Sequence, residues 1–145
     1  MMAVPAELSL VKENDRYKMK IWPVKELEQQ VKTQDILCEE GKSFEIPLND
    51  MAAVINFSWK QQSTGCTNIT AGGVSACVNF ETGNLIIENE THNKESIIIP
   101  FNKEIRLKVI IDCGIMEFFG NDGTIYAAVE AEEDVLRKIL TVESR

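Results

Sequence analysis

The sequence contains one histidine, His92, among its 145 residues. A serine or cysteine nucleophile ordinarily needs a histidine as its base, so no such catalytic arrangement can be assembled persuasively. His92 lies in the polar segment Thr91-His92-Asn93, where solvent exposure explains it better than catalysis does. The segment Ala71-Gly72-Gly73 lacks the lysine and the spacing of a phosphate-binding loop. The common hydrolase triads and nucleotide loops are therefore disfavoured.

Cysteine is sparse and irregularly spaced, and no C-x-x-C pair is present: Cys38, Cys66, Cys77 and Cys113. With one histidine in the chain, the ligand spacing of a zinc site is absent. We expect four reduced and mostly buried thiols. A Cys66–Cys77 disulfide is the alternative if the protein is exported. The sequence predicts no metal and no cofactor.

Positive charge is in the minority, and long apolar runs are missing. The chain has 15 basic and 23 acidic residues, a net charge of −8, which argues against binding to nucleic acid or to anionic lipid. No apolar run approaches the ~20 residues that span a bilayer. The first residues lack the basic region and the long apolar region of a signal peptide. The compartment stays open, with the bacterial cytoplasm preferred over export.

What is present is the composition of one globular domain, 44% hydrophobic and 26% charged. Short runs rich in Val, Ile, Phe and Thr alternate with turn residues, which predicts an all-β sandwich. We expect two antiparallel sheets, in a jelly-roll or concanavalin-like arrangement. The expected strands are Glu7–Leu10, Tyr17–Ile21, Ser43–Pro47, Ala53–Lys60, Val74–Phe80, Leu85–Glu88, Ser96–Ile99, Glu104–Asp112, Ile115–Phe119, Thr124–Glu130 and one near Ile139–Val142. Two segments have helical character, Val24–Val31 and Glu132–Leu140.

Residues 104–130 predict a three-stranded meander. A turn at Cys113-Gly114 places Asp112 opposite Ile115, Ile110 opposite Glu117 and Val109 opposite Phe118. The segment Gly120-Asn121-Asp122-Gly123 favours a tight second turn, because Asn and Gly tolerate positive φ. All three strands then agree on one apolar face: Ile105, Leu107, Val109, Ile111, Met116, Phe118, Ile125, Ala127 and Val129.

Residues 74–88 predict a hairpin in which Phe80 faces Leu85 and Val78 faces Ile87, with the apolar side chains on one side. In the strand before it, Trp59 shares a face with other apolar residues. We therefore expect Trp59 in the core rather than as a platform for sugars.

Acidic side chains are the remaining candidates for chemistry. Glu117, in apolar company, could act as an acid or base. We prefer an ion pair with Lys108, or a carboxylate that accepts hydrogen bonds where another layer packs on the sheet. Asp112 is best explained as a turn-stabilising side chain. The cluster that could hold Ca²⁺ is better explained as a solvated end of a strand: Glu130, Glu132, Glu133 and Asp134.

Three segments resemble a known family. Residues 112–123, DCGIMEFFGNDG, are similar to the D-R-S-S-V-E-V-F-x-N-x-G segment in the C-terminal domain of glycoside hydrolase family 32. VPAELSL (residues 4–10) resembles the family's I-P-R-E-L-S-L, and PVKELE (residues 23–28) resembles its P-V-x-E-L. On these motifs the family's structural positions are Asp112, Glu117, Phe119, Asn121 and Gly123.

The resemblance has two departures, both at arginine. The family's R-S-S is here Cys113-Gly114-Ile115, and the arginine of its opening motif is Ala6. Any salt bridge that those arginines make to the rest of the enzyme is therefore not carried over.

The family comprises invertases, levanases, inulinases and sucrose-6-phosphate hydrolases. The resemblance implies a single β-sandwich over residues 1–145, with residues 1–10 leading in from a catalytic β-propeller that this chain lacks. It also implies a retaining two-carboxylate hydrolysis in that propeller. The family's catalytic motifs W-M-N-D-P-N-G, R-D-P and E-C are absent here, so no catalytic residue is assigned. We expect an accessory domain of a β-fructosidase, acting on sucrose, levan or inulin, that packs on the propeller and associates with itself.

An alternative is a carbohydrate-binding module, because sandwiches often bind glycans through exposed aromatic side chains. Its candidate contacts are Tyr17, Trp22 and Tyr126. An independent hydrolase is the least favoured interpretation, since no catalytic set is present.

Overall fold

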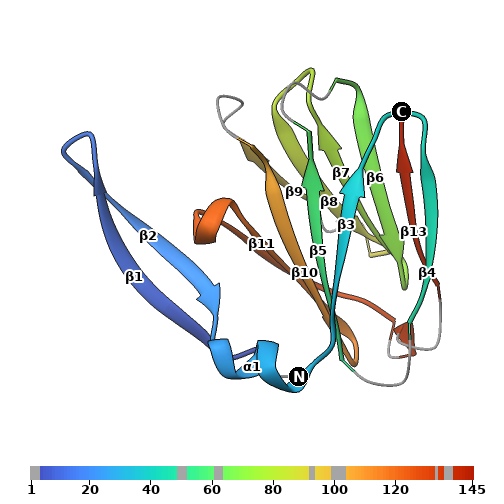
Figure 1. The fold of residues 1–145 in the computed structure, drawn as a ribbon, viewed down its shortest axis with the longest axis horizontal. Coiled ribbons are helices and arrows are strands. Elements are labelled where there is room, and N and C mark those ends of the chain that lie inside the picture. Colours follow the sequence, from blue (N-terminus) through green and yellow to red (C-terminus); the bar gives the residue numbers. More distant parts are fainter. Residues whose placement is uncertain are drawn as a thin grey trace.

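A computed structural model describes residues 4–48, 52–60, 64–91, 94–98, 104–132, 134–135 and 139–145. Within these residues the chain forms a two-sheet β-sandwich with a β-hairpin outside it (Figure 1). The two sheets and the single domain confirm the expected fold class. Residues 92 and 93 lie outside the described ranges, so the expectation for His92 is not addressed.

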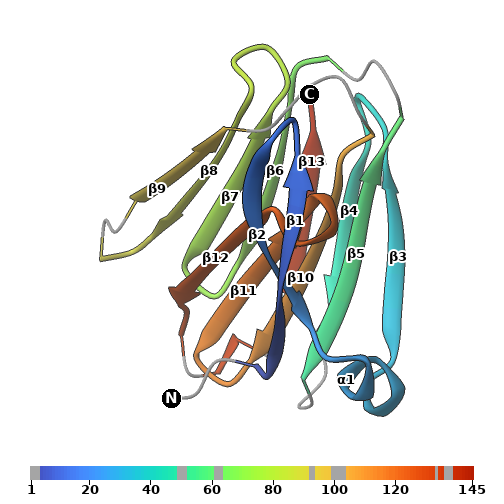
Figure 2. The same ribbon diagram turned by 90° about the vertical axis from the view of Figure 1, so that its left-hand side faces the viewer.

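The hairpin comes first, formed by β1 (Ala6–Glu13) and β2 (Arg16–Pro23). A short helix follows, α1 (Lys25–Gln30), inside the segment expected to be helical. Figure 1 shows the hairpin standing apart from the sandwich, with α1 connecting it to β3. In Figure 2, where the hairpin faces the viewer, it crosses in front of the strands β10–β12.

The first sheet of the sandwich has five strands in the order β12-β11-β10-β5-β3. Their bounds are β3 Thr33–Cys38, β5 Ala53–Trp59, β10 Arg106–Asp112, β11 Ile115–Gly120 and β12 Ile125–Glu130. The pairs are antiparallel except for β3 with β5, which run parallel. The short 3₁₀ helix η1 (Asn121–Gly123) joins β11 to β12.

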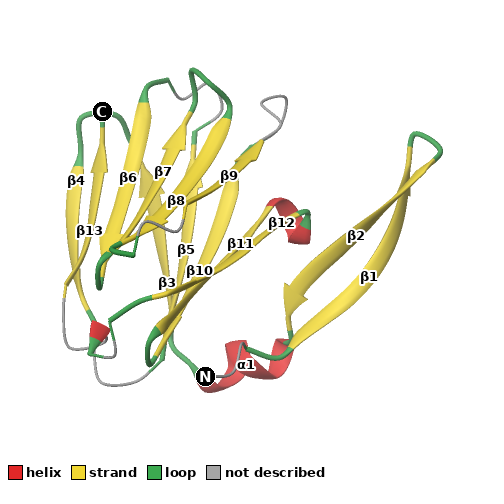
Figure 3. Ribbon diagram, turned by 180° about the vertical axis from the view of Figure 1, so that it is seen from behind, coloured by secondary structure: helices red, strands yellow, loops and turns green. Residues whose placement is uncertain are grey.

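The second sheet has six strands in the order β4-β13-β6-β7-β8-β9. Their bounds are β4 Ser43–Pro47, β6 Cys66–Ala71, β7 Val74–Asn79, β8 Asn84–Asn89, β9 Lys94–Ile98 and β13 Ile139–Ser144. Strand β13 lies between β4 and β6, so the end of the chain completes the sheet. Figure 3 shows the hairpin, the first sheet and the second sheet following one another as layers.

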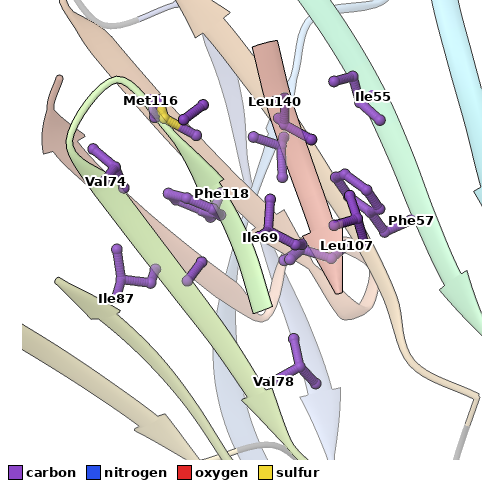
Figure 4. Close-up of a cluster of buried hydrophobic side chains, with 14 of the residues drawn as sticks. Ile55, Phe57, Ile69, Val74, Val78, Ile87, Leu107, Met116, Phe118 and Leu140 are labelled. Carbon is purple, nitrogen blue, oxygen red and sulfur yellow. The ribbon is translucent and has the colours of Figure 1, made fainter. Parts of the chain in front are cut away.

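The core lies between the two sheets, where alternate side chains of both meet (Figure 4). The apolar face predicted for the meander is buried throughout, and Trp59 is 3% exposed. The indole Nε1 of Trp59 donates a hydrogen bond to Thr67 Oγ1 at 2.9 Å, which satisfies its buried donor. The predicted meander and the core position of Trp59 are both confirmed.

The pairing in the meander agrees with the prediction residue by residue. Asp112 pairs with Ile115, Ile110 with Glu117 and Val109 with Phe118. The β7–β8 prediction is wrong by two residues, because Val78 pairs with Leu85 and Ala76 with Ile87. Asn79 Oδ1 accepts hydrogen bonds from the backbone N–H groups of Glu81 and Thr82, both at 2.9 Å, and this closes the turn early. A slip of two residues keeps each side chain on its predicted face.

Two further expectations need correction. The segment 132–140 was expected to be helical, but its last two residues, from Ile139 on, belong to strand β13. Residues 133 and 136–138 of this segment lie outside the described ranges. The four thiols are free as expected, but Cys38 alone is buried and Cys113 is exposed. Cys66 and Cys77 are half-buried, since both project from the outer face of their strands.

Candidate interface site

A second, smaller apolar cluster lies on the outer face of the five-stranded sheet. Val54, Ile110 and Phe119 are buried there, although this face points away from the main core. They are covered by residues from the N-terminal segment, β2, α1 and β12: Val4, Ile21, Trp22, Leu27, Val31 and Tyr126. Two rings pack against Phe119: that of Trp22 edge-on, with centroids 6.3 Å apart, and that of Tyr126 tilted, with centroids 5.0 Å apart. This cluster anchors the hairpin to the sandwich.

Glu117 lies within this layer and is 2% exposed. Its Oε1 accepts a hydrogen bond from the Tyr126 hydroxyl at 2.8 Å, and its Oε2 accepts one from the backbone N–H of Val4 at 2.8 Å. The geometry matches the second of the two structural interpretations, a carboxylate that accepts hydrogen bonds beneath another layer. No ion pair joins it to Lys108 among the described residues. Glu117 therefore ties the start of the chain to β11.

Lys108 is a buried cation on the same face, 6% exposed. Its ammonium group forms an ion pair with Glu28 of α1 and lies 5.0 Å from the centroid of the Trp22 ring. Burial lowers the pKa of Lys108, because leaving water disfavours the charged form. The ion pair and the cation–π contact offset that cost and hold α1 and β2 against β10.

The turn after β11 supports β2 from the side. Asn121, Asp122 and Gly123 all have positive φ, 47°, 55° and 98°. A Cβ at Gly123 would lie 2.7 Å from the carbonyl oxygen of Ile21, so only glycine lets the two backbones approach so closely. Asp112 stabilises the other turn of the meander, where its Oδ1 accepts a hydrogen bond from the Cys113 N–H at 2.7 Å.

The hairpin has one charged face and one apolar face. Cross-strand pairing places Leu8 with Ile21, Leu10 with Met19 and Lys12 with Tyr17 on one side. On that side, beyond the anchored base of the hairpin, four large side chains are more than half exposed: Leu8 68%, Leu10 71%, Tyr17 72% and Met19 57%. The opposite face carries Lys18, Lys20 and Trp22 and looks toward the sandwich. This orientation is the reverse of an ordinary surface hairpin.

Two adjoining hollows separate the hairpin from the sandwich and share Glu104 and Asp122 in their walls. The first has a volume of about 340 Å³ and lies between Trp22 and the outer face of β3, β5 and β10. The second, of about 570 Å³, lies between the tip of the hairpin and η1 and includes Lys18 and Lys20. We call the first of these the Trp22 groove. Its polar lining residues are Asp35, Asn56, Ser58, Glu104, Arg106, Lys108 and Asp122.

The candidate glycan contacts from the sequence do not gather in one place. Tyr17 lies on the outward apolar face of the hairpin, and Tyr126 donates a hydrogen bond to Glu117 beneath the hairpin. Trp22 lines the groove. Of the family positions, Glu117, Phe119, Asn121 and Gly123 lie at the base of the hairpin or in the turn beside it, and Asp112 lies at the far end of β10.

Sequence reasoning did not single out the apolar hairpin face or the groove. The alternation of Leu8 and Leu10 in β1, and of Tyr17, Met19 and Ile21 in β2, was a sufficient signal for the face. The groove left no local signal, because Asp35, Asn56 and Arg106 come from three strands far apart in the chain.

Within the described ranges, no cluster of three or more Cys, His, Asp or Glu side chains could hold a metal ion. Glu133, part of the acidic cluster considered for Ca²⁺, lies outside those ranges. No helix in the described part of the chain has the length and apolar character needed to cross a membrane.

The fold and the site together define a β-sandwich domain with an N-terminal hairpin arm that has one uncovered apolar face. No family model and no curated protein matches the sequence. Exo-inulinase from Aspergillus awamori shares the fold with a TM-score of 0.74 and 11% identity, over 98% of this chain and 32% of that enzyme. Sucrose-6-phosphate hydrolase from Lactobacillus gasseri shares it with a TM-score of 0.51 and 13% identity, over 94% of this chain and 30% of that enzyme.

Both enzymes belong to classes named in the resemblance, which is thereby confirmed at the level of the fold. This chain spans about a third of the length of either enzyme.

Proposed function

We propose that this chain is the accessory, non-catalytic β-sandwich of a β-fructosidase and that it packs on the catalytic propeller through the outward face of its hairpin. The exposed row Leu8, Leu10, Tyr17 and Met19 is the observation that carries the proposal. Fully burying one such side chain contributes about 1.5–3 kcal/mol. A partner that covers the row therefore gains several kcal/mol, and a chain without that partner leaves the row in water.

The structural comparison supports a further domain as the partner, which the family resemblance identifies as a propeller. The sandwich aligns along nearly its whole length with about a third of each of two fructoside-processing enzymes, so the remaining two thirds of each enzyme hold other structure. Residues 1–10 include the first part of β1, so the strand that presents the apolar row also belongs to the segment that leads in from the propeller. Hydrolysis of the fructosidic bond, with two carboxylates as in retaining glycosidases, takes place in the propeller.

The test combines this chain with the separately produced propeller of its enzyme, and measures binding by calorimetry and the melting temperature of the mixture. We expect a complex and a raised melting temperature for the propeller. A double variant, Leu8→Lys with Leu10→Lys, should abolish both effects. The control, Ser9→Glu with Val11→Glu, makes an equally large change of charge on the opposite face of the same strand, where Lys20 and Lys18 lie directly across, and should leave both intact. Equal behaviour of the two variants would refute docking through the apolar face.

The chain alone should associate with itself, because the exposed apolar row of its hairpin has no other partner. Sedimentation of the isolated chain should show oligomers that the Leu8→Lys, Leu10→Lys variant converts to monomers. A monomer at all concentrations would argue against this part of the proposal.

Binding of carbohydrate by the sandwich is a second candidate function. The Trp22 groove favours it, since an aromatic side chain stands there beside several polar ones.

A further inference from the structure

The Trp22 groove is concave because the hairpin overhangs the sheet. The outer face of β3, β5 and β10 is covered at one end by the hairpin and α1, and Trp22 stands where that cover stops. Its volume of about 340 Å³ lies within the range of small-molecule sites. A polar outer face of a sandwich is ordinarily flat and solvated, so the overhang by Trp22 distinguishes this place from the rest of the sheet.

The floor of the groove is a grid of polar side chains set by strand register. Asp35 pairs with Asn56 across β3 and β5, and Asn56 pairs in turn with Lys108 of β10. In the next row, Ser58 pairs with Arg106. These side chains share one face because cross-strand partners point to the same side of a sheet.

The floor retains much of its hydrogen-bonding capacity. Asn56 Nδ2 donates to Asp35 Oδ1 at 2.8 Å, and Arg106 Nη2 donates to Glu104 Oε2 at 3.1 Å. A carboxylate has two acceptor oxygens and a guanidinium has five N–H donors, so each pair uses only part of what its members offer. The groove therefore presents both donors and acceptors to a ligand.

The charges of the lining favour a neutral ligand. Three carboxylates, Asp35, Glu104 and Asp122, line the groove together with two cations, of which Arg106 is paired with Glu104 and the buried Lys108 with Glu28. An anion would meet the carboxylates and a cation would meet the basic groups, whereas a hydroxyl group can donate to one and accept from the other. Trp22 is half-buried and adds apolar area on which C–H groups can pack. From these features we propose that the Trp22 groove binds a neutral saccharide.

This site rests on the second candidate function, carbohydrate binding, and names its place and ligand class. It is independent of the docking role, because it uses the opposite face of the hairpin from the apolar row. The two proposals can therefore fail separately. Docking is tested by complex formation with the propeller and by the Leu8 and Leu10 variants. Saccharide binding is tested with the isolated chain and with variants of the groove floor.

The experiment titrates the ¹⁵N-labelled chain with fructose, glucose, sucrose, maltose and an inulin-type fructo-oligosaccharide, and follows amide shifts by NMR. We expect saturable shifts with a Kd on the order of millimolar for at least one sugar. They should be confined to residues that line the groove, on β3, β5, β10 and η1. Glucose 6-phosphate, which carries negative charge, should bind more weakly than glucose.

Two floor variants, Asp35→Ala and Arg106→Ala, should each weaken binding by about tenfold or more, as expected when a charged hydrogen-bonding group is lost. Both positions are exposed, so the variants should fold. The matched controls are Glu45→Ala on β4 and Arg16→Ala at the tip of the hairpin, which make the same changes of charge away from the groove and should bind as the parent chain does. Absence of shifts with every sugar, shifts elsewhere on the surface, or undiminished binding by the floor variants would each overturn the proposal.

Discussion

The hydroxyl of Tyr126 donates a hydrogen bond to Oε1 of Glu117 at 2.8 Å, and the two residues are neighbours on adjacent strands of the outer face. The other carboxylate oxygen of Glu117 accepts from the Val4 N–H. One buried side chain thus connects β11, β12 and the start of the hairpin. These hydrogen bonds explain how a glutamate can lie in apolar surroundings here, because both of its carboxylate oxygens have a donor.

Replacing Tyr126 by Phe should lower the free energy of unfolding by about 1–2 kcal/mol, because Oε1 of Glu117 then lacks a donor in a buried place. Urea denaturation measures the change. The chain supplies a matched control in its other tyrosine, since Tyr17 is 72% exposed. Tyr17→Phe should change stability by less than about 0.5 kcal/mol. Equal effects at the two positions would contradict the role assigned to Tyr126.

Gly123→Ala should release the hairpin from the sandwich. The new Cβ would lie 2.7 Å from the oxygen and 3.0 Å from the nitrogen of Ile21, so one of the two backbones must move. Gly41 is the control, because it also has positive φ, 77°, but a Cβ there would have nothing within 4 Å. Gly41→Ala measures the cost of the backbone angle alone, about 1 kcal/mol.

We expect Gly123→Ala to cost at least about 1 kcal/mol more than Gly41→Ala and to shift the NMR signals of β2. If both alanine variants lose the same stability and β2 signals stay in place, Gly123 does not hold the hairpin.

The meander of β10, β11 and β12 could be predicted to the residue because its information is local. Its turns are short and carry Gly114 and Gly123, so pairing follows from chain distance alone. The turn between β7 and β8 was harder, because the Asn79 side chain closes it one residue earlier than the apolar pattern suggests, which shifts the pairing by two residues. Side-chain hydrogen bonds of this kind leave no trace in hydrophobic periodicity.

Strand β3 was missed because its stability comes from a distant partner. Strand β3 contains the polar residues Gln34 and Asp35. It pairs in parallel with β5, so no tight turn between the two strands indicates the pairing.

Strand β6 was missed for another reason, because Gly72-Gly73, a two-residue hairpin turn that pairs β6 with β7, was considered only as a phosphate loop. On its other side β6 pairs with β13, whose Val142 lies opposite Ile69. The site depends on the same kind of long-range contact, since Val4 meets Glu117 from 113 residues away. Local patterns therefore predict faces and turns, and the assembled layers decide where the faces meet.

The thiols should react with iodoacetamide in an order set by exposure. Cys113 is exposed at the β10–β11 turn and should be alkylated first. Cys77 should follow more slowly, because burial, and secondarily its neighbour Cys66, raise its pKa and reduce the reactive thiolate. Cys38 should react last. Peptide mapping by mass spectrometry over time gives the order, and in urea the differences should vanish. Early labelling of Cys38 in the native protein would contradict its buried position at the end of β3.

Cys38 should also make stability fall at alkaline pH. Its side chain is 1% exposed, and burial raises its pKa from 9.0 to about 12. The unfolded chain loses this proton near pH 9, whereas the folded chain keeps it until about pH 12. Between these values the folded state binds more protons, so raising the pH favours unfolding. The stability that the neutral thiol contributes is complete below pH 9 and is lost as the pH rises through 12.

Cys38→Val removes this titration while keeping an apolar side chain of similar size in the strand. Comparing urea unfolding of the two proteins at several pH values above 9 isolates the contribution of Cys38, because the other titrating groups are common to both. The parent chain should lose up to about 1.4 kcal/mol more per pH unit than the variant. Parallel pH profiles would show that Cys38 ionises as readily in the folded protein as in the unfolded one, and that water reaches the end of β3 beside Trp59.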